Sequence, residues 1–137
     1  MAKTSTAPFA QTPKTATAVV TAAATVAGDS PTNTVELLTA GADGALVTRL
    51  TAMPRGTVTA SSLVLFLQKS GQTTQRLLDS ELMAAHTVAA TTAIPETAFG
   101  NVSDSTPLRL EAGDKLFVGS QVALAAGIVF AAQWMDY

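Results

Sequence analysis

The chain has 137 residues, of which only 13% are Asp, Glu, Lys or Arg, while hydrophobic residues reach 47%. It has no cysteine and a formal net charge of −2, which excludes a disulfide framework, a thiolate metal site and a densely basic surface for nucleic acid. This length suits one domain. Soluble monomers usually carry about 25–35% charged residues on their surface, so the low charge suggests a protein packed among other subunits.

Two apolar stretches bear on secretion and membrane insertion. The longest uninterrupted apolar run, residues 122–132, is shorter than the ~20 residues that a membrane-spanning helix requires. Residues 18–28 end in small side chains, as a signal peptide does, but threonines interrupt them and a long polar stretch precedes them. We therefore expect a protein made in the cytoplasm and without a membrane partner.

The first 15 residues are predicted to be an extended arm, and residues 16–137 the folded domain. The arm contains two prolines, several threonines and no hydrophobic periodicity, so it has too little apolar content to fold alone. It is either an idle terminus or a segment that docks on a partner. Docking would use Phe9, an isolated aromatic between two prolines, and the arm's two charges, Lys3 and Lys14.

From residue 16 onwards, short stretches rich in Val, Leu, Thr and Ala alternate with turn signals made of Gly, Pro, Asp and Ser. About eight strands with turns every 8–12 residues are typical of an all-β sandwich or barrel. We predict an all-β fold, a jelly-roll-like antiparallel β-sandwich. The expected strands span residues 16–27, 33–40, 44–53, 57–69, 73–90 (one strand, then a bend or a second strand), 107–112, 114–119 and 125–137, with an irregular loop at 94–107.

One segment leaves a helix open as an alternative. In residues 75–86, a helix would bring Leu77, Leu78, Leu82 and Met83 to one side. The same residues also fit the series of short strands, so the sequence supports both assignments.

The most highly charged stretch, residues 108–119, is predicted to be a hairpin and not a catalytic or metal-binding loop. Apolar and charged residues alternate along it, as in a half-buried strand. A turn containing Gly113 reverses the chain between the two halves. The charged residues are interpreted as exposed cross-strand partners; they are Arg109, Glu111, Asp114 and Lys115.

Strands that are apolar on both faces give the main functional signal. Residues 63–67 and 128–130 are continuously apolar, and Phe117 lies between two core-facing residues and should point outward. A small sandwich has no third layer of its own, so a second subunit is expected to cover these faces. We predict a homo-oligomer, with a trimer favoured. Its subunit contacts are assigned to Phe66, Phe117, Phe130 and Trp134.

Candidate chemistry is confined to one acidic stretch. Asp79 and Glu81 would share a strand face, and with His86, the only histidine, they suggest a carboxylate pair or an oxygen–nitrogen metal site. The alternative is a polar bend with a structural histidine. We prefer the second interpretation because no nucleophile elbow, phosphate-binding loop, dinucleotide motif or His-Glu-x-x-His motif accompanies these residues. We expect no enzyme, metal, cofactor or small-molecule substrate.

Four stretches together carry a resemblance to a known family: residues 39–67, 76–82, 107–119 and 122–137. They contain an Arg-Leu-x-Ala-x-Pro-x-Gly-Thr strand end, a Val-Leu-Phe-Leu strand close to the family's Val-x-Leu-Phe-Leu pattern, a Leu-x-Ala-Gly-Asp-x-Leu-x-Val segment and an aromatic-Asp-aromatic-like tail at residues 134–137. Over residues 33–137 the chain resembles small virion structural proteins of tailed bacteriophages and prophages. The resemblance implies a protein that decorates or cements the capsid surface.

Its implied partners are the major capsid protein or other virion proteins. A place in the tail, the baseplate or a head fibre stays open, and the resemblance includes no catalytic residues.

Overall fold

A computed structural model describes residues 9–26 and 28–137. Within these ranges the chain forms nine strands and no helix, and therefore no helix able to cross a membrane. The predicted all-β fold is confirmed, and residues 75–86 do not form the helix that was considered. The strands are β1 (Thr12–Val20), β2 (Val35–Thr39), β3 (Ala45–Pro54), β4 (Ser61–Gln68), β5 (Arg76–Met83), β6 (Thr97–Ala98), β7 (Leu108–Leu110), β8 (Lys115–Ser120) and β9 (Ile128–Asp136).

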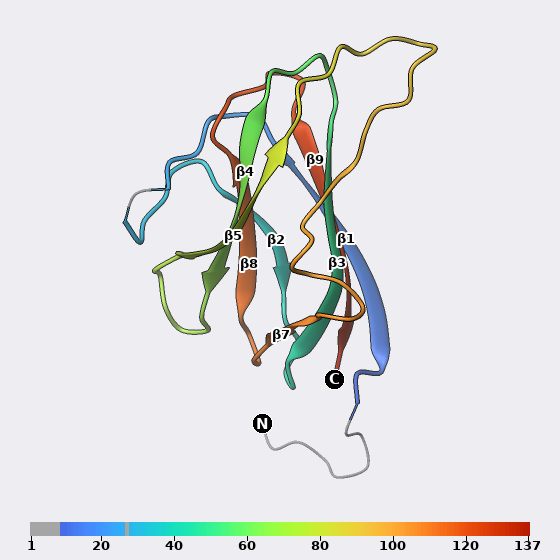
Figure 1. Cartoon of the computed structure of the whole chain (residues 1–137). Coiled ribbons are helices and arrows are strands. Elements are labelled where there is room, and N and C mark those ends of the chain that lie inside the picture. Colours follow the sequence, from blue (N-terminus) through green and yellow to red (C-terminus); the bar gives the residue numbers. More distant parts are fainter. Residues whose placement is uncertain (1–8, 27) are drawn as a thin grey trace.

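The strands form two antiparallel sheets that pack face to face (Figure 1). One sheet has the order β1-β9-β3-β6, with β7 also pairing with β3, and the other has the order β2-β8-β4-β5. Because β6 and β7 pair with opposite ends of β3, they share one strand position, and each sheet has four positions. Successive strands change sheet except from β4 to β5 and from β6 to β7. This interleaving is that of a jelly roll.

The core lies between the two sheets and takes every second residue of each central strand. On β9, Ile128, Phe130, Ala132 and Trp134 are buried, and the residues between them are partly or fully exposed. The ring centroids of Phe130 and Phe99 lie 6.4 Å apart inside this core. Phe130 and Trp134 are therefore core residues and not subunit contacts, because the strand alternation turns their side chains inward.

The outer face of the β2-β8-β4-β5 sheet is covered by the same chain. On β4, Leu63 and Leu65 belong to the core, so alternation turns Val64 and Phe66 to the outer side. These two side chains are nevertheless 1% and 0% exposed. Phe66 is thus no subunit contact either. Phe117, its partner across β8 and β4, is partly buried and is the one predicted subunit contact that is not buried.

The β1–β2 loop supplies this cover. The backbone N–H of Ala24 donates to the carbonyl of Ser120 (2.7 Å), and the carbonyl of Asp29 accepts from the N–H of Gln75 (2.9 Å), so the loop extends from the end of β8 to the start of β5. A Cβ added at Gly119 would lie 2.9 Å from the Ala24 methyl carbon. Glycine therefore allows the loop to pack directly on the sheet, and the third layer expected from a second subunit comes from the chain itself.

The sheet begins earlier than the sequence predicted. β1 pairs with β9 from Thr12 to Val20, so residues 12–15 belong to the domain and not to the arm. Lys14 is held there by an ion pair with Asp136, with 2.7 Å between Nζ and Oδ2. Phe9 precedes the strand and is 62% exposed, while Lys3 and the rest of the arm before residue 9 lie outside the described residues.

The segment of residues 108–119 connects the two sheets and is not a hairpin. β7 pairs with β3 in one sheet, and β8 pairs with β2 and β4 in the other. The turn between them needs Gly113, whose φ of 76° is in the left-handed region. The prediction of a turn was correct, and the prediction of cross-strand pairing between its two sides was wrong because each side pairs with strands distant in sequence.

Candidate functional site

The end of the sandwich opposite the C-terminus is built from four loops that contact one another (Figure 1). The N–H of Leu124 donates to the carbonyl of Thr21 (3.0 Å), and the N–H of Arg55 donates to the carbonyl of Gly127 (2.9 Å). The β5–β6 loop is joined to the β3–β4 loop by a backbone pair at Val58. We call this surface the loop end; it comprises residues 21–26, 55–60, 84–95 and 121–127.

The loop end carries almost no charge. Four stretches of sequence run into or out of it, residues 15–28, 56–68, 82–95 and 116–135, and none contains Asp, Glu, Lys or Arg. Arg55 is its single charged residue of these four types. Depletion of charged residues is the compositional signal that marks the centre of protein interfaces.

Exposed apolar side chains gather at the same end. Among the described residues, seven large hydrophobic side chains are exposed, and four of them lie in the loop end or on the strand ends beside it. These four are Val19, Leu82, Val88 and Val122, with exposures of 39%, 69%, 38% and 37%. The loop end is therefore the surface of the described chain best suited to bury against a partner.

Charged residues are concentrated away from the loop end, and most of them are paired. Lys14 pairs with Asp136 at 2.7 Å, and Lys115 pairs with Glu36 at 3.2 Å. Asp136 also accepts hydrogen bonds at Oδ1 from the indole N–H of Trp134 (3.2 Å) and the backbone N–H of Gly41 (3.1 Å). The aromatic-Asp-aromatic tail thus ties the last strand to the β2–β3 turn, which is a structural role.

The end of the sandwich opposite the loop end, which we call the charged end, contains the ion pairs of Lys14, Lys69 and Lys115. Asp114 is the centre of a second network there. Its carboxylate is 2% exposed, lies 2.7 Å from Nζ of Lys69 and accepts hydrogen bonds from the N–H groups of Ser70 (3.1 Å) and Glu111 (3.0 Å). Burial alone would raise the pKa of Asp114, but these bonds together hold that pKa below its usual range. The bond to Asp114 raises the pKa of Lys69 despite an opposing effect of burial. Asp114 is thus a buried turn anchor and not an exposed cross-strand partner.

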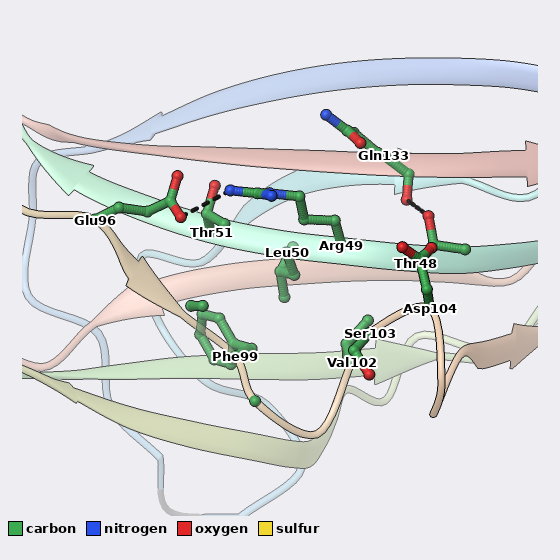
Figure 2. A pocket seen from close by; sticks show the side chains of 12 residues that line it. Thr48, Arg49, Leu50, Thr51, Glu96, Phe99, Val102, Ser103, Asp104 and Gln133 are labelled. Atoms are coloured by element: carbon green, nitrogen blue, oxygen red, sulfur yellow. Dashed lines mark hydrogen bonds and ion pairs between the residues drawn. The ribbon is translucent and has the colours of Figure 1, made fainter.

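A pocket of about 340 Å³ opens on the side of the sandwich, between β3 and the segment that follows β6 (Figure 2). It exists because β6 and β7 pair with the two ends of β3 and leave Thr48 and Arg49 without a strand partner on that side. The connecting segment arches away after Phe99, whose N–H donates to the carbonyl of Leu50 (3.0 Å). Phe99, Leu50 and Val102 lie against the pocket but have almost no accessible surface, because their side chains belong to the core.

Most of the lining residues that keep accessible surface are polar. Arg49 and Glu96 form an ion pair with 2.8 Å between Nη2 and Oε1, and Figure 2 shows both beside Thr51. Thr51 is only 6% exposed. Among the described residues, the carboxylate of Asp104 and the side-chain amide of Gln133 have no hydrogen-bond or ion-pair partner. No sequence signal pointed to these residues, because the pocket arises from a gap in strand pairing.

The acidic stretch considered for chemistry takes a structural arrangement. Asp79 and Glu81 do share one side of β5, where Asp79 accepts from the side-chain amide of Asn101 (3.2 Å) and Glu81 from the N–H of Gly100 (3.4 Å). His86 lies beyond the strand, paired through its backbone with the β3–β4 loop. The described residues contain no group of three or more His, Cys, Asp or Glu that could hold a metal ion.

Comparison with known proteins gives no evidence of function. No family model and no curated protein matches the chain. Among solved structures, the chain is similar to Eiger, a TNF of S. frugiperda, with 11% identical residues and a TM-score of 0.44. The likeness covers 93% of this chain and 96% of that chain. Similarity at this level carries no argument about function, so any functional conclusion must come from the molecule's own surfaces.

Proposed function

We propose that the chain is a structural protein of a bacteriophage virion that decorates the assembled head and stabilises it. The resemblance of residues 33–137 to such proteins suggests the role, and the loop end is the structural observation that best supports it. An uncharged surface with exposed Val and Leu side chains gains free energy when apolar area is buried. It also avoids the cost of burying unpaired charges.

The mechanism would be thermodynamic. A protein that binds the assembled shell, and not its free subunits, stabilises the shell by mass action. When the loop end faces the major capsid protein or another virion protein, the charged end points away from it. Several copies joined in one particle would raise the effective concentration at each neighbouring site.

The proposal includes a homo-oligomer, with a trimer favoured. The surface available for it differs from the one expected from the sequence, since Phe66, Phe130 and Trp134 are buried in the single chain. The edge strand β5 exposes Leu77 (52%) and Leu78 (42%) away from the loop end. Subunit contacts through these leucines would leave the loop end free to bind the shell.

The experiment that tests the proposal is co-sedimentation with tail-less capsids that lack the protein. We expect wild type to bind saturably, and Ala90→Asp or Ala123→Asp, both exposed in the loop end, to weaken binding roughly 30- to 150-fold. A carboxylate buried without a partner costs about 2–3 kcal/mol, which corresponds to such a factor. Ala42→Asp is the matched control because Ala42 is exposed in the β2–β3 turn at the opposite end.

Each result distinguishes one part of the proposal from another. Failure of wild type to bind any capsid would contradict the decoration role, and binding to tails or baseplates in its place would favour the alternative of a tail, baseplate or head-fibre component. Wild-type binding that both loop-end variants retain would place the attachment elsewhere. Loss of binding on deletion of residues 2–9 alone would assign it to the arm and Phe9.

A further inference from the structure

We propose that Arg55 binds a carboxylate of the partner, from an Asp or Glu side chain that lies within an apolar part of the partner's surface. This inference rests on the proposed attachment through the loop end, and it adds the chemistry of the partner. It is carried by the unpaired guanidinium of Arg55, by the fixed position of its backbone between two other loops, and by the absence of acidic residues from the loops around it.

Arg55 differs from the other cationic residues in having no partner. Of the eight Lys and Arg residues of the chain, seven lie in the described ranges. Five of these form ion pairs with carboxylates: Lys14, Arg49, Lys69, Arg76 and Lys115. A sixth, Arg109, donates from Nη1 to the hydroxyl of Tyr137 (3.4 Å). Among these seven, only the side chain of Arg55 has neither a hydrogen bond nor an ion pair.

The backbone of Arg55 is held between two neighbouring loops. Its N–H donates to the carbonyl of Gly127 in the β8–β9 loop (2.9 Å). The next residue, Gly56, packs so closely on that loop that an added Cβ would lie 3.0 Å from the Cβ of Ala126. On its other side the β3–β4 loop pairs with the β5–β6 loop through Val58. The exposed guanidinium therefore extends from a fixed point among the loops.

The loops around Arg55 cannot supply a carboxylate. Residues 15–28, 56–68, 82–95 and 116–135 contain no Asp or Glu. In the free chain the guanidinium is exposed and can remain hydrated. When the loop end is buried against a partner, the guanidinium loses this hydration, and a buried charge is tolerated only when it is paired. The counter-charge must then come from the partner.

A carboxylate matches both the charge and the shape of this group. The planar guanidinium can donate two parallel N–H bonds to the two oxygens of one carboxylate, whereas a main-chain carbonyl would leave the charge uncompensated. Arg is enriched at the centres of interfaces, where Lys is depleted, and the loop end contains no Lys. The exposed side chains of Val19, Leu82, Val88 and Val122 gain most when the partner's acidic residue is surrounded by apolar groups.

The test is co-sedimentation with tail-less capsids that lack the protein. Arg55→Gln should weaken binding at least about thirtyfold, because it leaves the partner's carboxylate buried and unpaired. Arg55→Lys keeps the charge but not the two parallel N–H groups, so it should weaken binding only about three- to tenfold. Arg109→Gln is the matched control, because it removes a guanidinium that has no carboxylate partner and lies on β7, outside the loop end. It should bind as wild type does.

A second measurement identifies the group that Arg55 contacts. A carbodiimide joins an amine to a neighbouring carboxyl group as an amide, with loss of water, and does not couple a guanidinium. Capsids that carry the Arg55→Lys variant should therefore yield a cross-linked peptide that joins position 55 to an Asp or Glu of a capsid protein. Mass spectrometry of the digest locates both residues. Wild type should give no cross-link at this position.

The outcomes separate this inference from the proposed function. If wild type binds no capsid, the proposed function fails and the inference fails with it. If wild type binds and Arg55→Gln binds equally well, the inference alone is overturned. It is also overturned if the bound Arg55→Lys variant gives no cross-link from position 55 to a carboxyl group. Weakened binding of Arg55→Gln together with that cross-link would support it.

Discussion

The two ends of the sandwich differ in how they use charge. At the charged end, Lys14, Lys69 and Lys115 each contact a carboxylate, and Asp114 and Asp136 are nearly buried while holding several donors. At the loop end, four loops present Ala, Thr and Val around the single Arg55. The charges of one end hold its turns together, whereas the other end carries only Arg55.

This difference explains the low overall charge of the chain. The charged residues, 13% of the chain, are unevenly distributed over the surface, because the charge-free stretches converge at one end. A surface that stays permanently in water has no reason to exclude charge selectively. A surface that is buried in an assembly does, because each unpaired charge would have to lose its water. The contrast is the reason to look for the partner at the loop end.

The largest expected effect is on the free energy of unfolding, and it distinguishes a buried, paired carboxylate from an exposed, unpaired one. Asp114→Ala should lower the free energy of unfolding by about 2–3 kcal/mol, because it leaves Lys69 and the N–H groups of Ser70 and Glu111 without their acceptor. Asp104→Ala, at an exposed and unpaired carboxylate, should change it by less than about 0.5 kcal/mol. Urea denaturation of the purified variants measures both. Equal small effects would show that the buried network does not hold the charged end together.

A smaller effect should appear as pH changes. Because the pKa of Asp114 is lowered by folding, its ionisation stabilises the fold above the unfolded value of about 3.9 and ceases to do so as pH falls through the folded value. Because the pKa of Lys69 is raised, its contribution is complete below about 10.4 and is lost as pH rises through the folded value.

The stability difference between wild type and Asp114→Asn should therefore be greatest between about pH 5 and pH 9, and should shrink toward both extremes. Urea denaturation across this pH series gives the difference directly. A difference that stays constant down to about pH 3 would contradict the assignment of these two groups.

The smallest expected effect concerns salt. Attachment through the loop end involves one charge, so the dissociation constant for capsids should change less than about twofold between 0.05 and 0.5 M NaCl. Attachment through Lys3 and other cations would weaken steeply over the same range. Co-sedimentation in a salt series distinguishes the two, and a steep dependence would move the binding surface away from the loop end.

Local patterns in the sequence determined the class of fold. Short alternating stretches separated by Gly, Pro and Asp are enough to predict strands and turns, since side-chain alternation depends only on neighbouring residues. The charge-free stretches of the loop end can also be found in the sequence. Nothing in the sequence shows that they meet at one end of the fold.

Long-range pairing decided the rest. The segment of residues 108–119 looked like a hairpin, but its two sides pair with β3 and with β2 and β4, so Asp114 became a buried anchor. Phe66 was predicted to contact a second subunit, but it is buried in the single chain, whose β1–β2 loop packs on the same face of the sheet. The pocket exists only because β6 and β7 leave the middle of β3 unpaired. Alternation fixes which side of a strand a residue takes, and the tertiary structure alone fixes what covers that side.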